Sequence, residues 1–165
     1  MSSQSQRELD ALDWQILREL QTDARLSHNE LARRVGLSSP AVTKRVRRME
    51  ESGVITGYRA EVDPAQVGLP LTALLHLRCD HEKCMLKTAR AKDYPEILEV
   101  LKVSGSHCTV IKAAVASTAH LEALLDRLGR HGPTQATMVW SSAFNRRTID
   151  WESGLPTVER PDEWQ

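Results

Sequence analysis

The fold of this 165-residue chain is decided by residues 27–49, which read SHNELARRVGLSSPAVTKRVRRM. Ser27 and Glu30 have the spacing of a capping box, in which Ser27 accepts a hydrogen bond from the Glu30 amide and Glu30 reaches back. Gly36 follows the first apolar pattern, and glycine ends helices readily in the left-handed conformation. The stretch therefore predicts a short helix, a glycine-containing turn and the start of a second helix.

The second helix is expected over residues 39–52, with Ser38 or Ser39 at its start. Its buried stripe is predicted to consist of Val42, Val46 and Met49, which repeat at helical spacing. At about 100° per residue, the opposite side carries Pro40, Thr43, Lys44 and Arg47. The pattern predicts a helix with an apolar inner side and a polar, cationic outer side.

A helix, a glycine-containing turn and a cationic second helix are the parts of a helix-turn-helix unit, whose second helix enters the major groove of DNA. A further helix is expected over residues 13–21, capped by Asp10 or Asp13. No carboxylate lies between Leu31 and Met49, whereas a merely solvated helix face usually carries both signs of charge. We therefore favour binding to double-stranded DNA over the alternative of a solvated face.

Two kinds of DNA contact are expected from this unit. Cations contact phosphates and set the register, while the outer side of the second helix approaches base edges. The expected DNA-binding residues are Arg33, Arg34, Ser39, Pro40, Thr43, Lys44, Arg45, Arg47, Arg48 and Arg59. Within this set, phosphate contacts are expected from Arg33, Arg34, Arg45, Arg48 and Arg59, and base contacts from the outer side of the helix.

The segment after the second helix predicts a wing and then a linker. Residues 54–62 alternate apolar and polar side chains around Gly57, which is typical of a two-stranded ribbon. Residues 1–62 are therefore predicted to form a winged helix-turn-helix domain. Proline and glycine residues then predict a linker over residues 63–70.

Residues 71–145 change to a period of two and predict a second domain. Strands are expected over residues 71–79, 97–103, 107–116 and 134–144, and helices over residues 82–92 and after Thr118. The order strand, helix, strand, strand, helix, strand is the ferredoxin-like βαββαβ arrangement, with two helices on one face of an antiparallel sheet. The whole chain is therefore predicted to be an α+β protein.

The other face of this sheet has no helix to cover it, although both faces carry apolar residues. The apolar residues that suggest this are Leu74, Leu98, Val100, Cys108, Val110 and Ala114. Exposed apolar surface of that kind usually marks a partner site, so a homodimer packed sheet to sheet is expected. The tail, residues 146–165, carries Trp151 and Trp164, which favours a strap over a neighbouring subunit above a flexible end.

Composition excludes several classes of protein. The chain has 22 Lys and Arg against 22 Asp and Glu, so its cations are concentrated only locally. The longest nearly apolar run, Leu69–Leu77, is shorter than the ~20 residues of a membrane helix, and no signal peptide is visible. A cytoplasmic protein without a membrane partner is expected. The motifs GxSxG, GxGxxG, HExxH and the P-loop are missing, so neither an enzyme nor a cofactor is predicted.

The three cysteines contain no CxxC pair, which predicts free thiols rather than a disulfide framework. Cys79, His81 and Cys84 nevertheless fall within six residues, so a metal- or thiol-sensing regulator is an alternative. Zinc sites prefer tighter pairs and a fourth ligand, and no metal site is predicted. An enzyme that handles amino acids is a further, weaker alternative, because ferredoxin-like domains also host catalysis.

Motifs along residues 12–68 are similar to those of a known family. They are LDxxILxxLxxDAR at 12–25, LAxxVGLS at 31–38, VxxRVxxMExxGVIxGY at 42–58 and DPxxxG at 63–68. The second half adds the element order and Val103-Ser104-Gly105 between the two middle strands. On these residues the chain resembles the Lrp/AsnC, or feast/famine, family of transcriptional regulators.

The resemblance implies a winged helix-turn-helix followed by a regulator-of-amino-acid-metabolism (RAM) domain, in dimers that often assemble into octamers. It also implies that an amino acid or related small metabolite binds between dimers, near the turn after the second strand. The effector-binding residues that it implies here are Val103, Gly105, Ser106, His107, Cys108, Thr134 and Gln135.

The chain departs from the family after Gly105, where members commonly have an acidic or aromatic residue. Ser106 and His107 offer hydrogen-bond acceptors to an ammonium group, but no full negative charge. The sequence leaves open whether the effector differs, binds weakly or is absent. It equally leaves open whether His107 binds a ligand or is a hydrogen-bonded histidine at the start of a strand.

Overall fold

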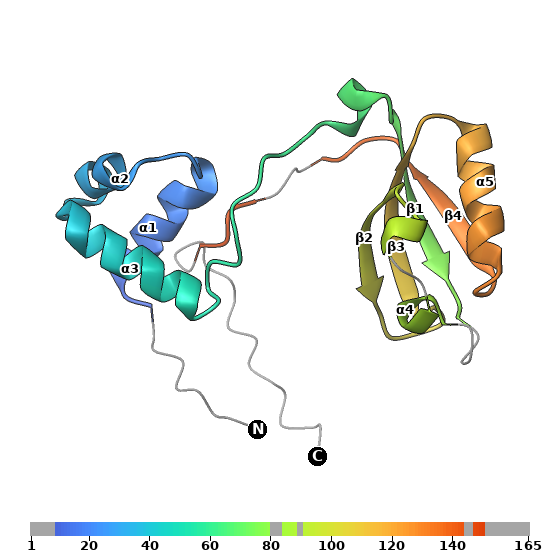
Figure 1. The fold of residues 1–165 in the computed structure, drawn as a ribbon, viewed down its shortest axis with the longest axis horizontal. Helices are drawn as coiled ribbons and strands as arrows, with labels where there is room; N and C mark the ends of the chain where they lie inside the picture. Colours follow the sequence, from blue (N-terminus) through green and yellow to red (C-terminus); the bar gives the residue numbers. More distant parts are fainter. Residues whose placement is uncertain (1–8, 80–83, 89–90, 144–146, 151–165) are drawn as a thin grey trace, which may run out of the picture. The chain divides into compact units, whose positions relative to one another are not determined.

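The computed structural model describes residues 9–79, 84–88, 91–143 and 147–150 (Figure 1). The described residues divide into two compact units, one containing residues 9–60 and 147–150 and the other residues 61–143. None of the helices in these ranges has the length and apolar character needed to cross a membrane. The fold class predicted above, α+β, is confirmed by three helices in the first unit and a helix-covered sheet in the second.

The first unit consists of α1 (Ala11–Thr22), α2 (His28–Val35) and α3 (Ser39–Glu51), which confirms the three predicted helices. Asp10 caps α1 through a full capping box with Asp13, whose side chain accepts from the Asp10 amide in return. The core between the helices is built from Ile16, Leu17, Leu31, Ala32, Val35, Val42, Val46 and Met49. The predicted inner stripe of α3 is therefore buried, and this fixes which side of α3 faces outward.

The capping prediction for α2 is correct in one half. The Ser27 hydroxyl accepts a hydrogen bond of 3.2 Å from the Glu30 amide, but the Glu30 carboxylate does not reach back. It binds Arg33 and Arg34 instead, because two guanidinium groups within one turn outcompete a single amide. Gly36 ends the helix with a φ of 70°, as predicted, and this left-handed conformation is one that glycine adopts without strain.

The two-stranded wing predicted over residues 54–62 does not form within this chain. Those residues contain no strand, and Val54, Tyr58 and Val62 are between 43% and 64% exposed. The alternation of apolar and polar side chains is present, but a ribbon also needs a partner strand for its backbone groups. The predicted linker, residues 63–70, contains a short 3-10 helix at Pro64–Val67 that begins at Asp63.

Residues 147–150 belong to the predicted tail and lie against α1 of the same chain. The Arg18 guanidinium contacts the Asp150 carboxylate at 3.0 Å, and the Gln21 side chain pairs with the backbone of Ile149. The strap over a neighbouring subunit stays a prediction, since Trp151 and Trp164 lie outside the described residues.

The second unit is one antiparallel sheet with the strand order β2-β3-β1-β4. Its strands are β1 (Leu71–Leu77), β2 (Ile97–Lys102), β3 (Thr109–Val115) and β4 (Thr134–Val139). The helix α5 (Thr118–Gly129) lies on one face, and Ser117 caps it, one residue before the predicted Thr118 (Figure 1). The element order and strand order confirm the ferredoxin-like arrangement.

The described residues of the segment predicted as a helix over 82–92 do not form one continuous helix, since Cys84 is not helical and Ala91–Asp93 is a 3-10 turn. The described part contains one turn of helix, α4 (Met85–Thr88), followed by the 3-10 turn η2 (Ala91–Asp93). Few apolar residues in this segment can bury a helix face, and among its described residues Met85 and Tyr94 enter the core.

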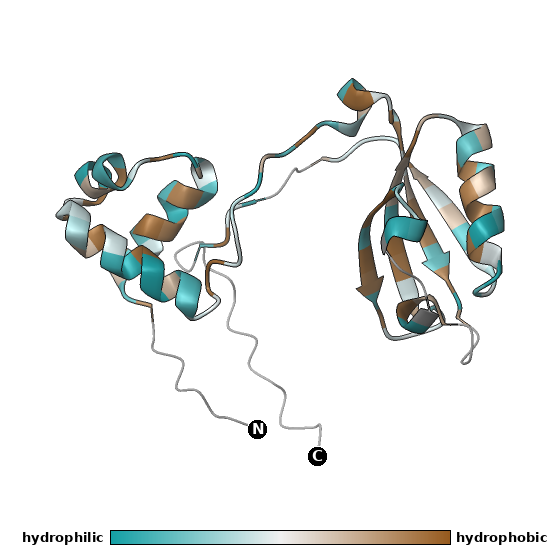
Figure 2. Ribbon diagram, viewed as in Figure 1, coloured by the Kyte–Doolittle hydropathy of each residue, from teal (hydrophilic) through white to brown (hydrophobic). Residues whose placement is uncertain are grey.

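The core of the second unit lies between α5 and the sheet. Leu121, Leu124 and Leu128 of α5 pack on the alternate residues of β1 and β3, which the alternation predicted. Ala114, which was predicted to lie on the open face of the sheet, is fully buried. The brown stripe along β2 in Figure 2 marks further apolar residues, of which Leu98 is 52% and Leu101 is 48% exposed.

The register of β2 corrects the predicted composition of the open face. Val100 is paired with Ile111, whose side chain belongs to the core beneath α5, so Val100 lies on the covered side. Leu101 is paired with Val110 and takes the open side instead. The reason is an irregularity between Ile97 and Glu99, which shifts the alternation of the strand by one residue.

Candidate nucleic-acid interface and effector turn

The outer side of α3 presents the residues that were predicted to approach DNA bases. Pro40, Thr43, Lys44 and Arg47 are all exposed, and Ser39 is partly so. Thr43 Oγ1 lies 2.9 Å from the Ser39 carbonyl, to which it donates, and 2.9 Å from His28 Nδ1. The hydroxyl of Thr43 is thus positioned by the start of α2 and the first turn of α3.

The two cations on this outer side have different surroundings. Arg47 forms an ion pair of 2.8 Å with Glu51, in which both side chains are more than 60% exposed. Lys44 forms no hydrogen bond or ion pair with any residue that the structure describes. An exposed pair between neighbouring turns is weak and exchanges readily with water or phosphate. Both cations are therefore accessible to an anionic partner.

The inner flank of α3 uses its cations within the protein. Asp13 is fully buried, and its carboxylate binds Arg45 at 2.8 Å and also Arg48. Arg45 reaches Asp10 as well, at 2.6 Å, and this hydrogen bond holds the pKa of the Asp10 carboxyl below its ordinary value. These contacts attach α3 to the first turn of α1. Arg45 and Arg48, which sequence assigns to phosphates, thus also orient the helix.

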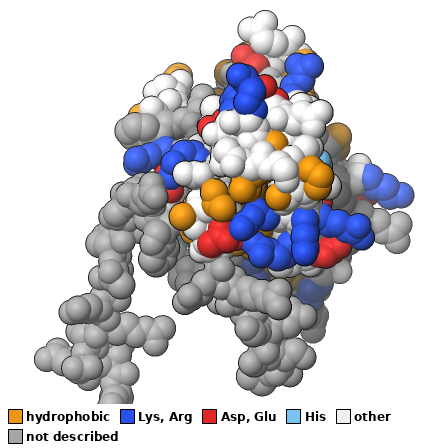
Figure 3. Space-filling view, turned by 90° about the vertical axis from the view of Figure 1, so that its left-hand side faces the viewer, with side chains coloured by type: hydrophobic (Ala, Val, Ile, Leu, Met, Phe, Trp, Pro, Cys, Tyr) orange, Lys and Arg blue, Asp and Glu red, His pale blue; other side chains and the backbone are white. Residues whose placement is uncertain are grey.

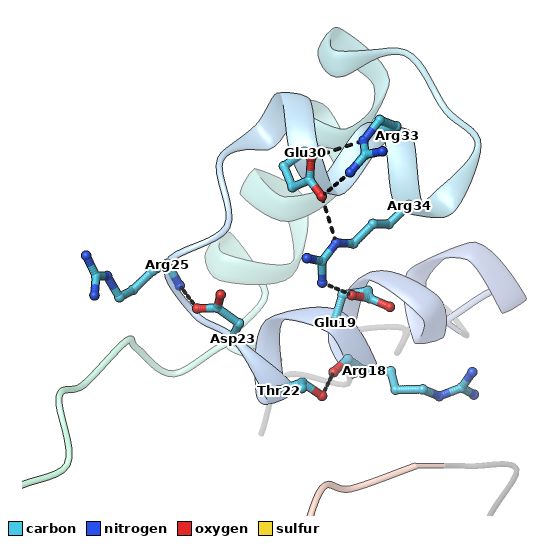
Figure 4. A network of polar contacts seen from close by, with 8 residues as sticks. All are labelled: Arg18, Glu19, Thr22, Asp23, Arg25, Glu30, Arg33 and Arg34. Carbon is cyan, nitrogen blue, oxygen red and sulfur yellow. Dashed lines mark hydrogen bonds and ion pairs between the residues drawn. The ribbon is translucent and has the colours of Figure 1, made fainter.

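A second charge network covers α2 (Figure 4). Arg33 and Arg34 bind Glu30 at 2.7 Å and 3.0 Å, and Arg34 continues to Glu19 of α1 at 2.8 Å. Hydrogen bonds from Arg33 and then Arg34 lower the pKa of Glu30 to about 2. Arg33 is 76% exposed despite its pair, so it remains open to solvent.

These pairs revise the picture of an all-cationic surface. On the face of the helix-turn-helix unit in Figure 3, Lys and Arg side chains gather together with acidic side chains. Residues 31–49 contain no carboxylate, and the acids that neutralise their cations come from outside that stretch. They are Asp10, Asp13, Glu19, Glu30 and Glu51. Arg59 is exposed in the extended segment after α3.

In the second unit, residues 103–108 form the turn predicted to bind an effector, which we call the effector turn. The Val103 amide donates to the Cys108 carbonyl at 3.1 Å, and the Cys108 amide donates to the Leu77 carbonyl at 3.1 Å. Gly105 has a φ of 117°, and a side chain built there would meet nothing within 4 Å. The effector turn is thus fastened to β1 and open around Gly105.

His107 of the effector turn lies next to His76 of β1, a residue that was not predicted from the sequence. The two rings meet edge to face with centroids 5.5 Å apart, and Ser106 Oγ lies 3.1 Å from His107 Nδ1. His76 is paired with Gln135 of β4, so it lies between the effector turn and the start of that strand. The sequence feature that could have identified His76 is a polar side chain at an outward-facing position of an otherwise apolar strand.

The register separates the two predicted effector residues of β4. Gln135 shares the open face with His76, whereas Thr134 is paired with Leu77 on the face covered by α5. Thr134 donates from Oγ1 to the Gly132 carbonyl at 3.2 Å and shapes the loop before the strand. For the alternative of a metal sensor, His81 lies outside the described residues. The residues that are described contain no group of three or more metal-ligating side chains.

Comparisons with known proteins match both units. The winged helix-turn-helix DNA-binding family matches residues 9–56, and the Lrp/AsnC ligand binding domain matches residues 72–148. A leucine-responsive regulatory protein of Rhizobium meliloti is 40% identical over 118 residues, covering 70% of this chain and 76% of that protein.

Two solved structures are similar over nearly their whole length. One is a feast or famine regulatory protein from M. tuberculosis complexed with L-methionine, with a TM-score of 0.79 and 34% identity. It is matched over 87% of this chain and 99% of that one. The other is LrpC of B. subtilis, with a TM-score of 0.79, 29% identity, and 84% of this chain and 99% of that one covered.

Proposed function

Because the chain belongs to the Lrp/AsnC family of transcriptional regulators, we propose that its α3 reads double-stranded DNA under the control of an amino-acid effector. The single observation that supports this most is the division of α3 into two sides. Arg45 and Arg48 fasten the inner flank to buried Asp13, while Lys44 and Arg47 lie exposed on the outer side. The proposed activity is binding, with no catalytic step.

In the proposed complex, Pro40, Thr43, Lys44 and Arg47 face the bases. A guanidinium can donate two hydrogen bonds to guanine, and the methyl group of a threonine suits a thymine methyl. Arg33, Arg34 and Arg59 contact phosphates, and Arg45 and Arg48 do so while they hold α3 in position. Breaking the exposed Arg47–Glu51 pair on binding costs little, since both groups are solvated already.

The DNA arm is tested by fluorescence anisotropy with a labelled duplex from the region upstream of the protein's own gene. We expect Lys44→Ala to weaken binding to this duplex by about 1–3 kcal/mol and to a scrambled duplex by less, because Lys44 faces the bases. Lys92→Ala in η2 is the matched control, because that lysine is also exposed and lies outside the proposed interface. Equal loss in both variants would contradict the assignment.

The proposed effector is an amino acid at the effector turn. Its carboxylate needs backbone N–H donors near Gly105, and its ammonium needs the acceptors that Ser106, His107 and Gln135 provide. A thermal-shift screen of the twenty amino acids is expected to raise Tm for one class of them. Ser106→Arg should abolish that shift and leave DNA binding intact, whereas an unaltered shift would place the effector elsewhere.

We further propose that the chain acts as a homodimer and assembles into larger particles such as octamers. The open face of the sheet exposes Leu98 and Leu101, and a second copy of the same face can cover them. An effector regulates such an assembly only if it favours one assembly over another. Leu101→Lys should shift the elution volume to that of a smaller species, while Leu86→Lys, on α4, should leave it unchanged.

A further inference from the structure

Cys79 and Cys108 come together at one end of the sheet, although they lie 29 residues apart in sequence. Cys79 follows β1, Cys84 precedes α4, and Cys108 closes the effector turn before β3. All three are partly exposed, so a small solute can reach them.

Several contacts connect Cys79 and Cys108. The Cys79 amide donates to Cys108 Sγ at 2.9 Å. Both sulfurs also lie near the hydroxyl of buried Thr109, Cys108 Sγ at 3.4 Å and Cys79 Sγ at 3.7 Å from Oγ1. The two sulfurs are thus close neighbours around one hydroxyl, and a disulfide requires them to approach to about 2.05 Å.

The same contacts make the two thiols chemically unequal. Partial burial works against ionisation of Cys108, but hydrogen bonds from Cys79 and Thr109 outweigh it and lower the pKa of the Cys108 thiol. Burial raises the pKa of Cys79 to about 11, helped by the neighbouring thiols. The thiolate is the reactive form of cysteine, and the Cys79 amide that donates to Cys108 Sγ stabilises it there, so Cys108 is assigned as the nucleophile of the pair.

We propose that Cys79 and Cys108 form a reversible disulfide on exposure to hydrogen peroxide, with Cys108 attacking first and Cys79 resolving. The Cys108 thiolate attacks one peroxide oxygen, the O–O bond breaks, and hydroxide leaves with a proton as water. Cys79 then attacks the resulting sulfenic sulfur, the S–S bond forms, and the S–O bond breaks to release a second water. Each sulfur loses one electron, and peroxide is reduced to two waters.

The disulfide would tie the effector turn to the end of β1, directly beside His107. Any effect on effector binding rests on the proposed function, but the thiol chemistry does not. Disulfide formation is therefore measured first, in purified full-length protein without DNA or amino acids. A failure of the disulfide proposal is then distinguishable from a failure of the proposed function.

Mass spectrometry can identify which cysteines are linked, because trypsin places the three cysteines in three different peptides. Cleavage after Arg78, Lys83, Lys87, Lys102 and Lys112 leaves them in peptides 79–83, 84–87 and 103–112. Reduced protein is treated with equimolar peroxide, alkylated and digested. We expect peptide 79–83 linked to 103–112, peptide 84–87 alkylated, a monomer on non-reducing gels, and full reversal by dithiothreitol.

Three variants test the roles. Cys79→Ser should stop at a Cys108 sulfenic acid that dimedone traps, and Cys108→Ser should slow peroxide consumption at least tenfold. Cys84→Ser is the matched control and should form the same disulfide at the same rate. A link between 79–83 and 84–87, or three equally alkylated peptides in the wild type, would overturn the proposal even if a variant failed to fold.

Discussion

On the flank of α3 that faces α1, Arg45 and Arg48 bind the buried carboxylate of Asp13, whereas on the outer side Lys44 and Arg47 lie in solvent. The four cations occupy five consecutive positions, and in the sequence they look equivalent. Their partners make them different: Arg45 and Arg48 hold α3 against α1, whereas Lys44 and Arg47 remain accessible to a ligand. Substitutions on the two sides should therefore separate stability from DNA binding.

The largest effect is expected from Asp13→Ala. Removing the carboxylate leaves Arg45 and Arg48 without their shared partner, and it deletes half of the capping box of α1. Breaking a buried ion pair is strongly destabilising, so we expect a loss of about 3 kcal/mol in the free energy of unfolding by urea. Asp10→Ala removes mainly a cap and should cost about 1 kcal/mol. Equal losses would show that Asp13 acts only through the cap.

Arg47→Ala should produce the opposite pattern. The side chain is exposed, so we expect the free energy of unfolding to change by less than about 0.5 kcal/mol. Specific DNA binding should weaken by about 1–3 kcal/mol if the guanidinium reads a base. Anisotropy with specific and scrambled duplexes measures this loss. An unchanged footprint and affinity would remove Arg47 from the interface.

The second unit contains a buried carboxylate that is less well satisfied. Glu96 Oε1 binds Arg127 and lies 3.0 Å from His120 Nε2, but Oε2 has no partner among the described residues. Burial opposes ionisation, yet the backbone, His120 and Arg127 outweigh it and hold the pKa of Glu96 below its ordinary value. Arg127 itself also donates to the Asp93 carbonyl and lies over the ring of Tyr94, whose hydroxyl pairs with His131.

Glu96→Gln is expected to cost less than Asp13→Ala, about 1.5 kcal/mol at pH 7. A carboxyl whose folded pKa is depressed contributes stability above its unfolded pKa of about 4.3 and loses it as pH falls through the folded value. The difference in stability between wild type and variant should therefore shrink below pH about 4.3. Urea unfolding at several pH values measures it, and a difference independent of pH would assign the loss to packing.

The sequence predicted the elements well where local chemistry alone determines them. Gly36 and the stripe of Val42, Val46 and Met49 required only spacing, and the structure confirms both. The prediction of a two-stranded ribbon over residues 54–62 was wrong, because alternation of apolar and polar side chains does not supply a partner strand. Val100 was placed on the wrong face because one irregularity in β2 reverses every side chain beyond it.

The candidate sites were predicted only in part, because the sequence does not show which distant residues come into contact. Sequence identified the cations of α3 but not their acids, since Asp13 lies more than thirty residues away from Arg45 and Arg48. Likewise, Cys79 and Cys84 are neighbours in sequence, but the pairing of β1 and β3 brings Cys108 to Cys79. Contacts that depend on tertiary packing carry no local signature.

The smallest effect is expected from Arg33→Ala, which tests whether a paired cation can still serve DNA. Arg33 is 76% exposed and paired with Glu30, which Arg34 also holds, so the loss should leave Tm unchanged within error. If Arg33 contacts a phosphate, binding should weaken on specific and scrambled DNA alike, and the salt slope should fall by about 1. An unchanged slope would show that its pair with Glu30 persists on DNA. Glu30→Gln separates these cases, because releasing both arginines should then tighten non-specific binding.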